Sequence, residues 1–186
     1  MKKLAFLVGL VLASAAPQAA AADWNMERSG SRLEFIATFE KSAAPGIFTE
    51  FDARVRFDPD KLTESRVDVT IAVTSADMSS AEVNKAIRGP EWFDFQQFQQ
   101  AEFHATDIRR TEANRYLARG TLSLKGVRQP IEVPFLWTDN TDAATMEGEV
   151  TVKRIAFGIG GGEWAATNVI GADVKVKFRV RLRKGV

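Results

Sequence analysis

From Ser31 onward, apolar residues recur at every second position along most of this chain. The first such segment places apolar residues at 33, 35, 37 and 39, which alternate with Arg32, Glu34 and Thr38. A period of two is typical of a strand with one buried and one solvated face. The pattern therefore predicts about eight strands, at positions 31–39, 47–57, 67–73, 102–108, 116–124, 131–137, 146–155 and 174–182.

One segment interrupts this alternation, between the third and fourth predicted strands. Ser79 precedes Glu82 by three residues, the spacing of a helix capping box, and predicts a short helix that runs to about Arg88 and stops at Gly89-Pro90. The prediction is an all-β fold of eight antiparallel strands with one short helical excursion. Closing the strands into a barrel removes exposed edges and leaves an interior for one small ligand. A flat β-sandwich is the alternative.

The first 22 residues have the composition of an export signal. Lys2 and Lys3 precede an apolar run over 4–16, and Ala20 to Ala22 offer a small-residue cleavage site. The run is too short to span a membrane. We expect a signal peptide over residues 1–22, one domain over residues 23–186, and a periplasmic location. The chain has no cysteine, so no disulfide or acylated cysteine contributes. Its near-neutral charge gives no case for nucleic acid as a partner.

Four groups of short motifs follow one another along the chain. They are GIFTEF at 46–51 with RFDP at 56–59, WFDF with two further phenylalanines over 92–103, GTLSLKGVRQP at 120–130, and KRIAFG at 153–158. They resemble, in the same order, motifs of the YceI-like proteins: G-x-F-x-x-F…F-D-P, F-F-D…Y-P…F, G-x-L-T-x-K-G-V-x-x-P and R-x-x-F-G. The resemblance covers the chain from about Trp24 to the C-terminus.

The resemblance implies a lipocalin-like barrel that holds a polyisoprenoid chain, of the ubiquinone or polyprenyl phosphate kind, in an apolar tunnel. The chain departs from the family pattern at three positions. Phe39 stands where members often have histidine, Gln99 replaces a proline, and Asn84 replaces an acid before the short helix. These departures leave the expected fold unchanged and concern the identity of the polar end of the ligand.

The aromatic content suits such a ligand. The sequence has 13 phenylalanines and four tryptophans against one tyrosine. An interior rich in rings, without converging polar groups, fits a long hydrocarbon better than a sugar or nucleotide. We expect a binding or carrier protein for an isoprenoid lipid, not an enzyme, with no cofactor or metal. The expected ligand-binding residues are Phe35, Phe39, Phe51, Val69, Ile71, Trp92, Phe93, Phe103 and Phe135, with Arg88 and Arg154 at the polar end.

Residues suited to catalysis are few. His104 is the only histidine, and it should face solvent because Phe103 and Ala105 occupy the inner positions of its strand. A zinc site would need several such ligands. Asp94, set among aromatics, most simply caps a turn. Two other functions stay open: a small periplasmic hydrolase with a carboxylate pair, and an accessory subunit that hands quinone to a membrane redox partner. The oligomeric state is also open, a homodimer included.

Two features near the C-terminus complete the sequence picture. The glycine-rich stretch 158–162 matches no phosphate-binding loop and predicts a flexible connection near the barrel mouth, with Trp164 as a lid. The last strand carries a basic stripe, defined as Lys175, Lys177, Arg179, Arg181 and Arg183. This stripe pairs with acids on a neighbouring strand or makes transient contact with anionic lipid headgroups. A hairpin centred near 163–164 would pair positions that sum to about 328. This register sets Glu149 opposite Arg179 and Glu147 opposite Arg181, and it leaves Lys175 and Lys177 without an acidic partner.

Overall fold

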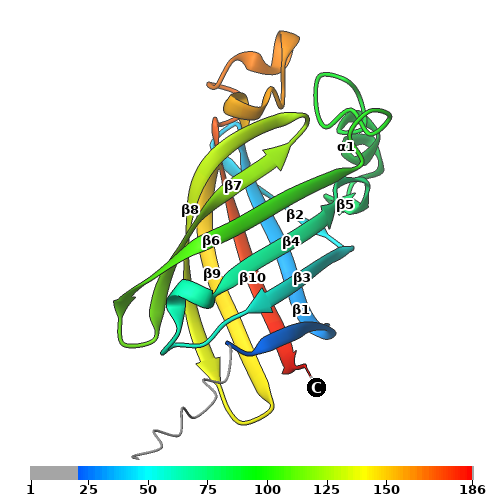
Figure 1. Cartoon of the computed structure of the whole chain (residues 1–186). Coiled ribbons are helices and arrows are strands. Elements are labelled where there is room, and N and C mark those ends of the chain that lie inside the picture. The colour runs from blue at the N-terminus through cyan, green and yellow to red at the C-terminus, as the bar shows by residue number, and fades with distance from the viewer. Residues whose placement is uncertain (1–20, 186) are drawn as a thin grey trace, which may run out of the picture.

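The structure is a computed structural model that describes residues 21–185, so all but the last two residues of the predicted signal peptide lie outside it. Within the described residues, one antiparallel sheet contains ten strands (Figure 1). They are β1 (Asp23–Phe39), β2 (Ser42–Phe48), β3 (Phe51–Arg56), β4 (Arg66–Ala72), β5 (Ala76–Asp77), β6 (Gln100–Glu112), β7 (Arg115–Leu124), β8 (Val127–Asp139), β9 (Ala143–Lys153) and β10 (Asp173–Lys184).

The sheet closes into a barrel because β1 pairs with β10. Its ten strands make eight passes along the barrel wall, each of which we call a crossing. β2 and β3 form one crossing along β1, interrupted at Thr49 and Glu50, and a 3₁₀ turn at Val73–Ser75 separates β4 from β5 in another. Every crossing neighbours the next in sequence. The predicted eight-stranded antiparallel barrel is therefore confirmed, and the flat sandwich is not what forms.

The helical excursion lies where the sequence predicts it, between the third and fourth crossings, but its first turn differs. Helix α1 covers Ala81–Ala86, and the Ser80 hydroxyl accepts a hydrogen bond from the Val83 amide at 3.4 Å. Ser79 has a φ of 56° and lies outside the helix, so the predicted cap at Ser79 is wrong by one residue. No helix within residues 21–185 has the length and apolar character needed to cross a membrane.

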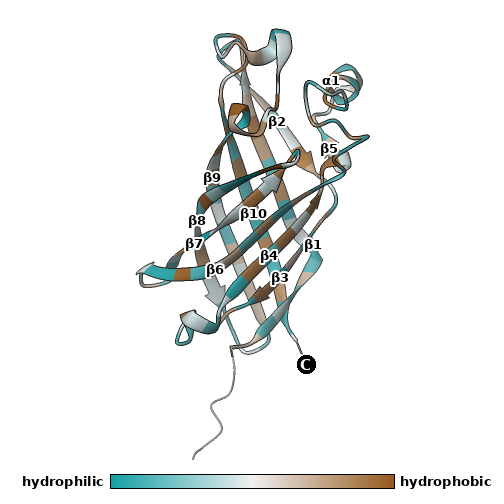
Figure 2. Cartoon of the chain, turned by 45° about the horizontal axis from the view of Figure 1, so that its top comes forward, coloured by the Kyte–Doolittle hydropathy of each residue, from teal (hydrophilic) through white to brown (hydrophobic). Residues whose placement is uncertain are grey.

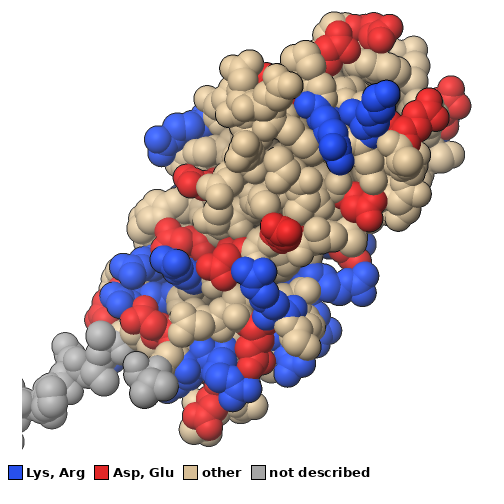
Figure 3. Space-filling view, turned by 90° about the vertical axis from the view of Figure 1, so that its right-hand side faces the viewer, with Lys and Arg blue, Asp and Glu red and all other residues tan. Residues whose placement is uncertain are grey.

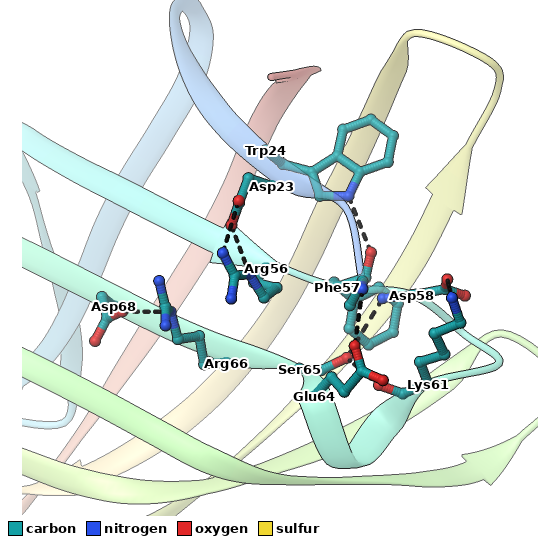
Figure 4. Close-up of polar contacts among 11 residues, drawn as sticks. Asp23, Trp24, Arg56, Phe57, Asp58, Lys61, Glu64, Ser65, Arg66 and Asp68 are labelled. Carbon is teal, nitrogen blue, oxygen red and sulfur yellow. Dashed lines mark hydrogen bonds and ion pairs between the residues drawn. The ribbon is translucent and has the colours of Figure 1, made fainter. Parts of the chain in front are cut away.

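One end of the barrel is filled by aromatic rings. Phe57 is 1% exposed, and its ring centroid lies 4.5 Å from that of Trp137 and 4.9 Å from that of Tyr116. The Trp24 indole donates to the Phe57 carbonyl at 3.0 Å, which fixes the start of β1 against the end of β3 (Figure 4). Two hydrogen bonds of 2.8 Å join Arg56 and Asp23 beside them. These residues belong to one buried cluster, so this end is packed as a protein core.

The two faces of the strands follow the alternation in the sequence (Figure 2). On β6, Phe103 and Ala105 are buried, while His104 is exposed and contacts the Asp68 carboxylate on neighbouring β4. The outward orientation predicted for His104 is confirmed.

The register of the last two strands differs from the expected one. Paired positions of β9 and β10 sum to 326, so Glu149 lies opposite Lys177 and Glu147 opposite Arg179. Lys175 and Lys177 both reach Glu149, at 3.4 and 3.3 Å, and the expectation that these two lysines have no acidic partner is wrong. The rest of the basic stripe also pairs with acids: Arg179 with Glu147, and Arg181 and Arg183 with Glu27. The structure therefore favours a paired outer face over a lipid-binding one.

Candidate functional site: an apolar cavity at the open end of the barrel

The upper half of the barrel encloses a cavity of about 680 Å³. Each of the eight crossings contributes side chains to its wall, together with α1 and the segments that cover the mouth. Nearly all of these side chains are apolar, and a volume of this size lies within the usual range for small-molecule sites. Nine of the eleven residues expected to bind ligand line it: Phe35, Phe39, Phe51, Val69, Ile71, Trp92, Phe93, Phe103 and Arg154.

Close approach between two strands shapes one side of the wall. The Phe35 ring on β1 lies over Gly46 on β2, where a Cβ atom would come within 2.3 Å of the ring. Glycine at this position therefore lets the ring lie flat against the neighbouring strand. The same ring lies 5.0 Å from the Phe48 ring, between centroids. Gly46 is the first residue of the GIFTEF motif, which gives that motif a direct role in shaping the cavity.

The cavity reaches solvent at the mouth. Phe39 and Val83 both line it, yet they are 46% and 38% exposed, so the mostly apolar wall extends to the outer surface. Helix α1 borders one side of the mouth, and the segment 154–172 between β9 and β10 rises over the other (Figure 1). In the side view, charged side chains gather over the lower half of the molecule and are sparser on the upper half (Figure 3).

A buried arginine holds the segment over the mouth in shape. Arg154 is 3% exposed. Its guanidinium donates five hydrogen bonds to main-chain carbonyls, with nitrogen–oxygen distances of 2.7 to 3.0 Å. These carbonyls belong to Ile159, Gly160, Trp164, Ile170 and Gly171. Burial lowers the pKa of Arg154. Arg154 borders the cavity, but it acts as a structural clamp with no donor left for a ligand.

Lys125 makes a second clamp at the mouth. Its ammonium donates to the carbonyls of Pro90 and Gly158, each at 2.7 Å, and so ties two covering segments to the β7–β8 turn. Burial is the main cause that lowers the pKa of Lys125. The amides of Gly160 and Gly161 donate to the Glu91 carbonyl at 2.7 and 2.9 Å, which joins the same segments directly. The predicted flexible loop at 158–162 is thus held by specific bonds.

Trp164, expected as a lid, forms part of the cavity wall. Its ring lies 6.0 Å from that of Trp92, between centroids, and both residues line the cavity. The Arg154 guanidinium lies 5.9 Å from the Trp92 ring centroid, within range of a cation–π interaction. The two tryptophans therefore share one part of the cavity wall, and Arg154 contacts both the Trp164 main chain and the Trp92 ring.

Two of the expected ligand-binding residues lie away from the cavity. Phe135 points inward as expected, but it belongs to the packed aromatic end, 5.7 Å from Phe57 between ring centroids. Arg88 is exposed just beyond α1 and does not line the cavity. Alternation distinguishes inside from outside, but it does not show at what height along the barrel a side chain lies. Sequence reasoning also missed wall residues that follow the same alternation, among them Leu33, Phe48, Leu122, Met146, Val176 and Phe178.

Groups suited to catalysis are sparse around this cavity. Glu82 is the one carboxylate among its lining residues within 21–185, so no pair of acids faces a common substrate there. Asp94 is buried with a φ of 51° and accepts a hydrogen bond from the Gln97 side chain at 2.8 Å, which is the turn role expected for it. No group of three metal-binding side chains occurs in the described part of the chain.

Comparison with known proteins places this geometry in a family. The model of the YceI-like domain matches residues 24–182. A UPF0312 protein of Vibrio campbellii is 31% identical over 137 residues, which cover 72% of each chain. The crystal structure of Burkholderia cenocepacia BcnA is similar with a TM-score of 0.81 and 30% identity, and the match covers 84% of this chain and 98% of BcnA.

A second solved structure shares the fold at lower identity. It is a polyisoprenoid binding domain from Saccharophagus degradans, with a TM-score of 0.69 and 14% identity over 87% of this chain and 98% of that domain. The family match spans all eight crossings and both covering segments of the cavity. The chain belongs to the YceI-like domain family.

Proposed function

We propose that this protein is a periplasmic carrier that binds one isoprenoid lipid in the cavity and catalyses no reaction on it. The observation that carries the proposal is the almost wholly apolar wall, to which all eight crossings contribute and which includes the exposed side chains of Phe39 and Val83. Family membership supports a lipid-binding barrel, and the signal-like residues 1–22 support export.

Desolvation would supply most of the affinity. Each buried methylene contributes on the order of 0.8 kcal/mol, so several isoprene units bind tightly without directed polar contacts. Phe35, Phe51 and Phe103 would contact the chain through their ring faces and edges, which accommodate double bonds and methyl branches. A single carboxylate in the wall gives no support to a hydrolase with a carboxylate pair.

Native mass spectrometry of protein purified without added lipid, followed by organic extraction, tests this proposal. We expect one prenyl lipid, of the quinone or polyprenyl phosphate kind, for each protein chain. A protein that is recovered without lipid, and that fails to bind an added prenyl alcohol, would contradict it.

A further inference from the structure

The ladders of the barrel wall are interrupted where β1 bends, as they also are between β8 and β9 above the Leu136–Glu147 pair. The β1–β3 ladder ends at Asn25 and the β1–β2 ladder begins at Leu33, so neither ladder joins residues 26–32 to the neighbouring crossing. The bend contains Gly30 with a φ of +85°. On the opposite side, the Ser31 hydroxyl accepts a hydrogen bond from the Arg181 amide at 3.0 Å, which seals β1 against β10. The β1–β10 ladder skips residues 28–31 as well, but this bond joins the two strands there, so the opening lies on the side of β2 and β3.

A second pocket, of about 260 Å³, occupies this opening. It shares three wall residues with the large cavity: Leu33, Phe48 and Phe51. Its inner end is therefore apolar and adjoins the proposed lipid site. Arg28, Ser31 and Arg32 line the pocket as well, so its wall is mixed where that of the main cavity is almost wholly apolar. A pocket that combines these two characters suits the junction between a hydrocarbon chain and a polar headgroup.

Arg28 differs in its charge environment from the cations at the mouth. It is exposed, and within residues 21–185 its side chain makes no ion pair or hydrogen bond. Two acids of β1 are engaged with other arginines: Glu34 with Arg32 at 2.8 Å, and Glu27 with Arg183 at 2.6 Å. Arg154, by contrast, has used all five donors. The guanidinium free to bind an anion thus lies beside the wall opening.

We propose that this side opening is a headgroup portal, where Arg28 binds the anionic headgroup of an isoprenoid lipid whose chain lies in the main cavity. Guanidinium groups bind phosphate and carboxylate oxygens through paired, charge-assisted hydrogen bonds. This inference rests on the proposed function, since it needs the chain to occupy the cavity. It moves the polar end of the ligand away from Arg88 and Arg154, where the sequence placed it.

Two probes with the same chain test the portal: geranylgeranyl phosphate and geranylgeraniol. We expect the full exported chain to bind the phosphate about tenfold more tightly than the alcohol at low ionic strength. Arg28→Gln should remove that preference and leave the affinity for geranylgeraniol unchanged. The matched control is Arg54→Gln, an exposed arginine on β3 that lines neither pocket. It should keep the preference.

Three results would overturn the portal: equal affinity of the unmodified protein for the two probes, a preference that survives Arg28→Gln, or the same loss in Arg54→Gln. Failure of the unmodified protein to bind geranylgeraniol would instead contradict the proposed function, because that probe has no anionic group. The two ideas can therefore fail separately.

Discussion

The two ends of this barrel are built from the same alternating strands, yet one is a packed core and the other a cavity. At the closed end, aromatic ring centroids lie 4.5 to 5.7 Å apart around Phe57. At the open end, rings of similar size on Phe35, Phe51 and Phe103 surround about 680 Å³ of space. Inward-facing apolar residues therefore do not by themselves specify a core. What differs is whether the rings meet across the barrel or remain on its wall.

Truncation of an aromatic ring should distinguish the two ends most strongly. Phe57→Ala should lower the free energy of unfolding by about 3–5 kcal/mol, because it leaves a void among packed rings. Phe51→Ala should cost only about 1–2 kcal/mol, because its ring already borders an open cavity and is part exposed. Urea unfolding followed by tryptophan fluorescence measures both. Equal losses would mean that the two ends are packed alike.

Insertion of a ring should give the opposite contrast between two alanines of β6. Ala101 lines the cavity, whereas Ala105 is 1% exposed beside Gly120, where a Cβ would already come within 2.8 Å of the Ala105 Cβ. Ala105→Phe should therefore destabilise the fold by about 1–3 kcal/mol through overpacking. Ala101→Phe should cost less than about 1 kcal/mol, since its ring enters open space. A larger loss in Ala101→Phe than in Ala105→Phe would contradict a cavity at this position.

The smallest effect concerns an ion pair on the outside of the closed end. The hydrogen bond from Arg56 is the main cause that holds the pKa of Asp23 below its usual value. A lowered carboxyl pKa stabilises the fold above the usual aspartate range and loses that effect as the pH falls through the native value. Arg56→Gln should thus be slightly less stable than the unmodified protein at pH 7, with the difference shrinking below about pH 4. Thermal unfolding at pH 7 and pH 3 measures this difference in stability. A difference that is larger at pH 3 than at pH 7 would contradict a stabilising Arg56–Asp23 pair.

Alternation in the sequence was enough to predict the eight crossings, the inward position of Phe103 and the outward position of His104. It failed where the answer depends on the third dimension. Phe135 faces inward as predicted, but strand tilt places it among the packed rings. Paired positions of β9 and β10 sum to 326, whereas the expected sum was about 328. The difference arises because the segment between these strands contains two 3₁₀ helices and is not a symmetric hairpin.

The polar groups were harder to predict than the apolar ones. Arginine is rarely buried, and nothing in the sequence around Arg154 indicated that five main-chain carbonyls would surround its side chain. The sequence indicated Lys125 only as part of the GTLSLKGVRQP motif and did not predict its contacts. The turn itself was predictable, because Lys125 and Gly126 have positive φ values of 49° and 75° and glycine is a common turn residue. Such contacts depend on which loops meet in the folded protein, and the local sequence pattern does not contain that information.

If the cavity holds a lipid, a charge placed in its wall should prevent binding. Phe103→Asp would put an unpaired carboxylate against the ligand chain, while Phe103→Leu keeps the wall apolar. Circular dichroism establishes that both variants are folded, and native mass spectrometry after incubation with geranylgeraniol counts bound lipid. We expect one lipid per chain for the unmodified protein and Phe103→Leu, and none for Phe103→Asp. Full lipid occupancy in folded Phe103→Asp would contradict lipid binding in the cavity.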